Sequence, residues 1–296
     1  VRDFVSNNIT PYEGDASFLQ GPTERTKAVW NHCLKALEEE RNNNGIRALD
    51  YTTVSTITSH PAGYIDKENE LIVGLQTDQV LKRAIKPFGG INVVMKACRE
   101  NGVEVDDRVK DIFTHYRKTH NDGVFDVYTE EIRSFRSLGF LTGLPDNYAR
   151  GRIIGDYRRL ALYGLDRLIE AKKEDLHNLT GPMTEARIRL REEVAEQIKA
   201  LKEIKVLGEY YGLDLSRPAY TAQEAVQWVY MAYLAAVKEQ DGAAMSLGNV
   251  SSFLDIYLEY ELSQGTITET FAQELIDQFV IKLRICLLYT SPSPRD

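Results

Sequence analysis

The stretch RIIGDYRRLALYGLDRLIEA (Arg152–Ala171) decides the fold class, because its apolar residues return every three or four positions. One stripe collects Ile154, Tyr157, Ala161, Leu165 and Leu168, and the charged residues lie elsewhere. This pattern is typical of an amphipathic helix that buries one face against a core. We therefore predict a helix over Arg152–Ala171 in a protein built mainly from helices.

Most of the chain repeats this helical pattern. Helices are expected over residues 24–40, 109–118, 184–211, 225–238, 253–262 and 268–285. Thr221–Glu224 and Thr266–Glu269 match capping boxes, in which a threonine and a glutamate bond the free N–H groups of a helix start. Short apolar runs at Leu71–Gln76 (LIVGLQ) and Gly242–Leu247 (GAAMSL) are the strand candidates. The expected fold class is mainly α with a few β-strands.

Composition excludes several classes of protein. The 296 residues are 43% hydrophobic and 27% charged, the balance of a soluble globular protein. A formal net charge of −8 argues against a general nucleic-acid binder, and no apolar run is long enough for a membrane helix. The cysteines (Cys33, Cys98 and Cys286) and the five histidines lack metal-ligand spacing, so we predict no metal site. Cys33 and Cys98 are expected to be buried as small apolar side chains.

The densest polar cluster surrounds Arg152. If the helix begins there, Arg152, Asp156 and Arg159 share one face. An arginine guanidinium grips a carboxylate with two parallel hydrogen bonds, and Gly151 and Gly155 leave room for a ligand to approach. The cluster indicates a site for a small anionic substrate. The alternative is a helix start with ordinary surface ion pairs.

The end of the sequence breaks the helical pattern. In CLLYTSPSPRD (Cys286–Asp296), Pro292 and Pro294 follow an apolar stub. This string resembles the in-frame translation of a sequencing adapter, and a native disordered tail is the alternative. We expect residues 1–285 to be the N-terminal part of a longer, incomplete domain and residues 286–296 to be a non-native tail.

Seven stretches carry a family resemblance. They are VRDFVSNNITPYEGDASFL (Val1–Leu19), STITSHPAGYI (Ser55–Ile65), IVGLQTD (Ile72–Asp78), PFGGI (Pro87–Ile91), YRKTHNDGVFDVYT (Tyr116–Thr129), LTGLPDNYARGRIIGDYRRLALYG (Leu141–Gly164) and AAMSLG (Ala243–Gly248). Together they resemble the N-terminal part of pyruvate formate-lyase, or formate C-acetyltransferase, a family of glycyl-radical enzymes. The resemblance runs from Val1 to about Ile285.

The resemblance implies a cytoplasmic, homodimeric acyltransferase of anaerobic carbohydrate fermentation. Its fold would be the N-terminal part of a ten-stranded α/β barrel surrounded by helices. The family converts pyruvate and coenzyme A, a co-substrate, to acetyl-CoA and formate. A glycyl radical, made by a separate radical-SAM activating enzyme, passes to a pair of adjacent cysteines, and a cysteine thiyl attacks pyruvate. No nucleic-acid or membrane partner is implied.

The resemblance also implies roles for individual residues. Arg152 would hold the carboxylate of pyruvate, and Ala243 would line the pyruvate pocket. Phe125 and Arg136 fall where the family contacts coenzyme A. Ile198 stands where a well-known member of the family has a histidine near coenzyme A, so we expect part of that contact set to differ here.

The chain departs from the family pattern in its covalent chemistry. None of its three cysteines adjoins another, and it contains no C-terminal radical glycine. We therefore predict no catalytic residue within this chain, which by itself would be inactive and bind no cofactor. Two alternatives stay open. One is a 2-ketobutyrate formate-lyase, and the other is a non-catalytic helical scaffold protein with a self-contained core.

Overall fold

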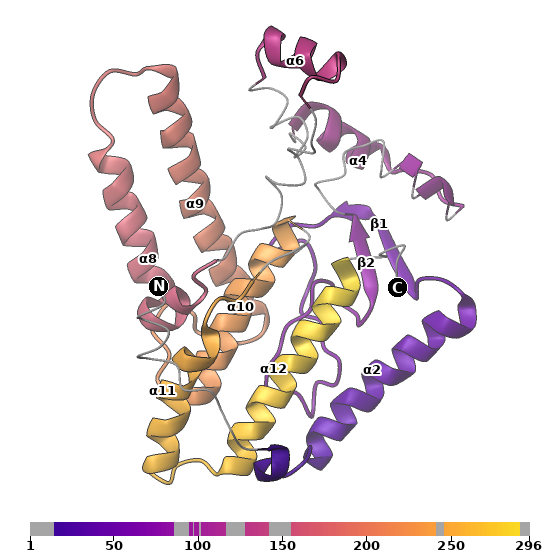
Figure 1. Cartoon of the computed structure of the whole chain (residues 1–296), viewed down its shortest axis with the longest axis vertical. Helices are drawn as coiled ribbons and strands as arrows, with labels where there is room; N and C mark the ends of the chain where they lie inside the picture. The colour runs from indigo at the N-terminus through magenta and orange to yellow at the C-terminus, as the bar shows by residue number, and fades with distance from the viewer. Residues whose placement is uncertain are drawn as a thin grey trace.

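Helix α10 (Ala222–Gln240) lies at the centre of the helical core, because it is apolar on every face (Figure 1). Its fully buried residues include Ala225, Val226, Val229, Tyr230, Met231 and Leu234. Four further helices contact it: α8 (Arg158–Asn178), α9 (Glu185–Tyr210), α11 (Val250–Ser263) and α12 (Glu269–Thr290). The surrounding helices are amphipathic and turn their apolar sides toward α10.

The computed structural model describes residues 15–85, 95–96, 98–100, 102–116, 128–141, 155–240 and 246–290. Its remaining elements are η1 (Ala16–Phe18), α2 (Glu24–Asn43), β1 (Ala48–Val54), β2 (Lys82–Ile85), α4 (Asp107–Asp111), the π-helical turn η3 (Ile112–Tyr116) and α6 (Glu130–Ser137). The described residues are mostly helical with few strands, which confirms the predicted fold class. None of the described helices combines the length and the apolar character needed to cross a bilayer.

The two strands form a parallel pair. Ala48 pairs with Lys82 and Asp50 with Ala84, and the register shifts between Asp50 and Val54. Beyond β1 the ladder continues, because the backbone N–H of Ser55 donates to the carbonyl of Ile85 at 2.9 Å. A small apolar cluster made of Val54, Ile85, Cys98, Val105 and Val109 packs at this end of the pair.

Helix α2 follows its sequence signals and packs against α12. Thr23 caps its start, where the Thr26 N–H donates to the Thr23 hydroxyl at 3.1 Å. Asn44 ends it in the left-handed region at φ 47°. Cys33 is buried on its inner face, and burial raises the pKa of that thiol to about 12. Cys33 and Cys98 are both buried and free, as predicted.

The predicted strand at Leu71–Gln76 is wrong, because this segment runs between helices and has no strand partner among the described residues. Side chains of α10 and α12 bond its backbone instead. The Gln227 side-chain oxygen accepts from the Val73 N–H at 2.7 Å, and its amide donates to the Val73 carbonyl at 2.9 Å. The segment is therefore extended without being part of a sheet.

The helix predicted over Arg152–Ala171 begins later and is interrupted. Residues 155–157 precede α8, which starts at Arg158. Gly164 sits in the left-handed region at φ 69°, and a Cβ there would lie 2.4 Å from the carbonyl carbon of Arg217. The next two N–H groups, of Leu165 and Asp166, donate to the carbonyls of Leu215 and Ser216. Tyr157, Ala161 and Leu165 are nevertheless buried, as the predicted stripe requires.

The other helix boundaries lie close to the predicted ones. Thr221 caps α10, where the Glu224 N–H donates to its hydroxyl at 3.1 Å. The cap of α12 is Thr268 rather than Thr266, because the Phe271 N–H donates to Thr268 at 3.2 Å. Helix α12 continues through Thr290, five residues into the segment predicted to be a non-native tail. Of the strand candidate GAAMSL, residues 242–245 lie outside the described residues.

Candidate functional site

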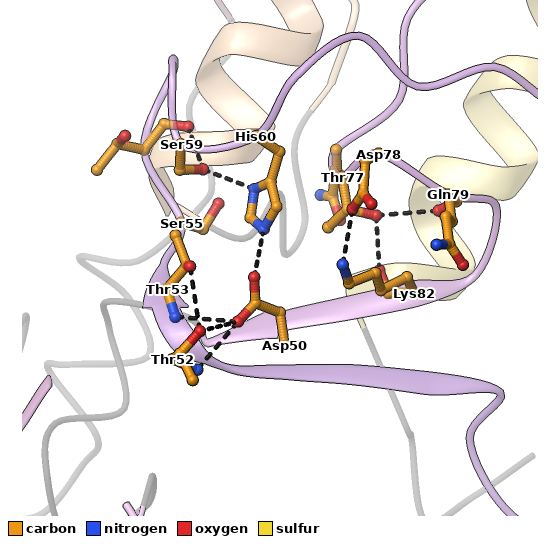
Figure 2. Close-up of polar contacts among 12 residues, drawn as sticks. Asp50, Thr52, Thr53, Ser55, Ser59, His60, Thr77, Asp78, Gln79 and Lys82 are labelled. Atoms are coloured by element: carbon orange, nitrogen blue, oxygen red, sulfur yellow. Dashed lines mark hydrogen bonds and ion pairs between the residues drawn. The ribbon is translucent and has the colours of Figure 1, made fainter. Parts of the chain in front are cut away.

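The carboxyl ends of β1 and β2 lie side by side, and polar side chains gather where β1 ends (Figure 2). In sheets of parallel strands, ligands bind beyond the carboxyl ends of the strands. The chain after β1 is the motif Ser55–Ile65, and the chain after β2 leads into Pro87–Ile91, which lies outside the described residues. This edge of the sheet is therefore the candidate ligand-binding site.

His60 joins a serine to a carboxylate at this edge (Figure 2). Its Nδ1 lies 2.8 Å from the Ser59 hydroxyl, and its Nε2 lies 3.1 Å from Oδ2 of Asp50. The other oxygen of Asp50 accepts hydrogen bonds from the N–H and hydroxyl of Thr52 and from the N–H of Thr53. Because the imidazole is only 4% exposed, its orientation is fixed.

Burial and charge set the protonation of this group. Burial lowers the pKa of His60 below its ordinary value, and the nearby Lys238 ammonium lowers it further, against the opposing effect of Asp50. For Asp50, burial alone would raise the pKa, but the hydrogen bonds from Thr52, His60 and Thr53 together lower it. The favoured state is a neutral His60 that donates from Nε2 to an ionised Asp50.

The same edge is bonded to the end of α10. The Ser55 hydroxyl donates to the carbonyl of Lys238 at 2.6 Å, and the Ile57 N–H donates to the Glu239 carboxylate at 3.2 Å. Lys238 is 1% exposed and its ammonium donates to the carbonyl of Gln76 at 2.8 Å. These contacts hold the segment after β1 and the backbone at Gln76 against the last turns of α10.

The start of α8 is attached to α10 as well. The ring of Tyr157 packs edge-on against the ring of Tyr233, with centroids 5.6 Å apart, and both tyrosines are buried. Tyr157 lies five positions after Arg152, and Lys238 lies five positions before Ala243. Both Tyr157 and Lys238 are therefore held at the carboxyl half of α10.

Three of the four predicted site residues, Arg152, Ala243 and Phe125, lie outside the described residues. The fourth, Arg136, lies on α6, which stands away from the helices around α10 in Figure 1. Its guanidinium carbon lies 5.6 Å from the ring centroid of Tyr128, at the start of the described segment.

The predicted helix face shared by Arg152, Asp156 and Arg159 is wrong, because Asp156 precedes α8. Its carboxylate instead pairs with Arg158, at 2.7 Å from the guanidinium, on the protein surface. That short hydrogen bond lowers the pKa of Asp156, against a smaller opposing effect of burial.

Sequence reasoning missed the Asp50–His60 pair. The strand was not predicted, so the carboxylate had no assigned place, and His60 was considered only as a metal ligand. The signal available was a histidine next to serine in the densely hydroxylated run TTVSTITSH (residues 52–60). Among the described residues no group of three histidine, cysteine or acidic side chains is arranged to hold a metal ion.

Solved structures identify the class of fold. The B12-independent glycerol dehydratase from Clostridium butyricum matches with a TM-score of 0.62 at 18% identity, over 91% of this chain and 40% of that one. Hydroxyproline dehydratase from Clostridioides difficile matches with a TM-score of 0.60 at 14% identity, over 90% of this chain and 40% of that one. A glycyl radical enzyme from Archaeoglobus fulgidus matches with a TM-score of 0.51 at 17% identity, over 77% of this chain and 34% of that one. The fold is thus part of the glycyl-radical-enzyme fold.

Sequence comparison narrows the class to a family. Residues 2–293 match the family described as pyruvate formate lyase-like. A formate acetyltransferase from Haemophilus influenzae is 54% identical over 297 residues, which cover 99% of this chain and 39% of that protein. The chain belongs to the pyruvate formate lyase-like family and spans about two-fifths of the length of this curated relative.

Proposed function

We propose that this chain supplies the N-terminal part of a formate C-acetyltransferase, which converts pyruvate and coenzyme A to acetyl-CoA and formate. The observation that carries the proposal is the 54% identity to the Haemophilus formate acetyltransferase over nearly the whole chain. The complete enzyme works in the cytoplasm as a homodimer and is activated by a radical-SAM enzyme. Its glycyl radical and cysteine pair supply the radical that cleaves the carbon–carbon bond of pyruvate.

In this proposal Arg152 holds the carboxylate of pyruvate, and Ala243 lines the same pocket. Two parallel hydrogen bonds from a guanidinium would fix the plane of the carboxylate as well as its position. The contacts of α10 support this pairing. Arg152 lies five positions before Tyr157, a span of at most about 18 Å, and Tyr157 packs on Tyr233 of α10. Ala243 follows the Lys238 turn of the same helix by five residues.

Phe125 and Arg136 contact coenzyme A in this proposal. An arginine suits the phosphates of coenzyme A because its guanidinium is always charged and donates in a planar fork. Arg136 is half-buried on α6 beside the ring of Tyr128, so it carries a permanent charge next to an aromatic surface.

The chain alone is expected to yield no formate from pyruvate and coenzyme A, even with the activating enzyme under anaerobic conditions. Cys33 and Cys98, both buried, and Cys286 are the only cysteines in the sequence, and none can form an adjacent pair. We also keep the proposal that residues 286–296 are a non-native tail. Measurable formate production by this chain would contradict this assignment of the covalent chemistry.

The test of Arg152 uses a chimera in which residues 1–285 of this chain replace the matching segment of the Haemophilus relative. Arg152→Lys should lower kcat/KM for pyruvate by about 10- to 100-fold, because lysine loses one charge-assisted hydrogen bond and the planar fit. Arg158→Lys is the matched control, since Arg158 pairs with Asp156 on the surface. An unchanged kcat/KM in the Arg152 variant would remove this residue from the pocket. The same assay with 2-ketobutyrate shows which 2-oxo acid the chimera prefers.

A further inference from the structure

We propose that Asp50, His60 and Ser59 form a positioning unit that fixes the last turn of α10 against the carboxyl ends of β1 and β2, five positions before Ala243, the residue that the proposed function assigns to the pyruvate pocket. The assignment of a pocket role rests on the proposed function. The positioning of α10 itself does not.

The Ser59 side of the unit is a turn that runs from Thr56 to Ser59. The Ser59 N–H lies 3.3 Å from the Thr56 carbonyl, and the Ser59 hydroxyl lies 3.0 Å from the same oxygen. The hydroxyl is also 2.8 Å from His60 Nδ1, and the far side of the imidazole bonds Asp50 of β1. The imidazole therefore ties the turn to a residue ten positions earlier in the strand.

The residues on either side of Thr56 connect this turn to α10. The last carbonyls of a helix have no partner within the helix. At α10 the Ser55 hydroxyl, which is buried, donates to the carbonyl of Lys238. The Ile57 N–H adds a bond to Glu239 in the final turn. Ser55 and Ile57 flank Thr56, so the geometry of the turn sets both contacts.

The charges that face His60 come from three parts of the fold. Asp50 comes from β1, Asp78 from the segment that precedes β2, and Lys238 from α10. Three donors occupy one oxygen of Asp50, which leaves the other for Nε2 of His60. With a hydrogen on Nε2, Nδ1 is free to accept from Ser59.

The group is not a nucleophilic triad, although it contains a serine, a histidine and an aspartate. In such triads the serine bonds Nε2 and the carboxylate bonds Nδ1, whereas here the two partners are exchanged. The backbone N–H of Ser59 also donates to the Thr56 carbonyl, and His60 is almost fully buried. The arrangement holds its members in place and presents no nucleophile to a substrate.

Hydrogen exchange measured by mass spectrometry on the 296-residue chain tests the unit without any activity assay. His60→Ala and Ser55→Ala should each speed exchange in the peptide covering residues 236–250 by about threefold to tenfold, the effect of losing one or two net hydrogen bonds. Exchange in α9 should stay unchanged. His115→Ala is the matched control, because His115 makes a similar 2.8 Å contact with Asp111 on the surface.

Two conservative variants separate the contribution of the Ser59 contact from that of the Asp50 contact. His60→Asn keeps a polar atom near Nδ1 and His60→Gln keeps one near Nε2, so each should restore part of the protection lost in His60→Ala. In the chimeric enzyme His60→Ala should raise the KM for pyruvate more than it lowers kcat. An inactive parent chimera would count against the proposed function alone. Unchanged exchange over residues 236–250 in both the folded His60→Ala and Ser55→Ala chains would overturn the positioning role.

Discussion

Two extended segments of this protein differ in whether they pair with another strand, and in each case the outcome is the opposite of what apolar content suggests. Ile72–Gln76 lies in an apolar, partly β-branched run that is typical of a buried strand, yet it pairs with no strand in the part of the chain that is described. Ala48–Val54 contains an aspartate and two threonines and forms the parallel strand β1. The difference shows that a partner backbone, rather than apolar content, decides whether an extended chain becomes part of a sheet.

The apolar segment has its hydrogen bonds met by side chains. Gln278 accepts from the Leu71 N–H, Tyr211 accepts from the Leu75 N–H, and Lys238 donates to the Gln76 carbonyl. The Gly74 carbonyl accepts from both Tyr230 and Lys282. These donors and acceptors reproduce what a neighbouring strand would supply, since buried backbone groups must be paired.

The largest expected effect comes from removing the charge that anchors this segment. Lys282 is 2.8 Å from Glu70, and both side chains are buried. Lys282→Met should lower the free energy of unfolding by ~3–5 kcal/mol, because it leaves the Glu70 carboxylate buried without its partner. Urea unfolding measures the change, and the double variant with Glu70→Gln should regain part of the loss.

Lys173→Met provides the control for that experiment. Lys173 pairs with Glu170 at 2.6 Å, but both side chains are exposed. Its loss should cost less than ~1 kcal/mol, as is usual for surface pairs. Equal effects at the two lysines would show that the segment does not depend on its buried anchor.

A methyl group at Gly74 should cost ~2–4 kcal/mol. Gly74 has φ 126°, and a Cβ there would lie 2.8 Å from Leu234 and 3.0 Å from Tyr230. Gly74→Ala therefore combines backbone strain with overpacking against α10. Gly212→Ala separates the two causes, because Gly212 has φ 70° with open space around it. Thermal unfolding should rank the Gly74 variant as clearly the less stable.

Gln227→Leu should cost ~2 kcal/mol, because it leaves both backbone groups of Val73 without their partner. The matched control is Gln197→Leu on α9, where the glutamine bonds only Glu193 on the helix surface. Urea unfolding of the two variants should differ by more than the scatter of surface substitutions. Similar losses would mean that Val73 finds other partners.

The smallest effect is a pH dependence at β1. The pKa of Asp50 is lowered from 3.8 in the folded state, so its ionised form contributes stability that is present above pH ~4 and is lost as the pH falls further. The pKa of His60 is lowered from 6.5, so its contribution is complete above pH ~6.5 and is lost as the pH falls through the folded value. As the pH falls below ~4, the free energy of unfolding of the Asp50→Asn chain should decrease less than that of the unchanged chain, by of order 1 kcal/mol.

The spacing of apolar residues was sufficient to predict those helices whose ends and buried faces depend on local sequence. The starts and faces of α2, α9 and α10 follow from caps and apolar spacing, and the family resemblance agrees with the sequence and fold comparisons. The interruption of α8 could not be predicted, because it depends on the carbonyls of Leu215 and Ser216, some fifty residues away. The Asp50–His60 contact was missed for a different reason: the strand that carries Asp50 was not predicted, so nothing placed this carboxylate beside the loop that follows it.

Arg152 and Ala243 stay predictions of the resemblance. The local sequence pattern predicted an anionic ligand for Arg152 and placed this residue on a helix. That helix begins only at Arg158. Residue chemistry could suggest what such a guanidinium binds, whereas its surroundings depend on how α8 and α10 meet.

The interruption at Gly164 divides α8 into two segments that are held by different parts of the fold. Its first turns belong to the side of the fold where Tyr157 rests on α10, and the remainder forms a long arm with α9, fixed at its base to residues 215–216. Because the arm is registered at that base, whole turns could be added or removed at its tip around Gly181 without shifting Tyr157. Evolution can therefore vary the length of this projection while the packing of Tyr157 on α10 keeps its geometry.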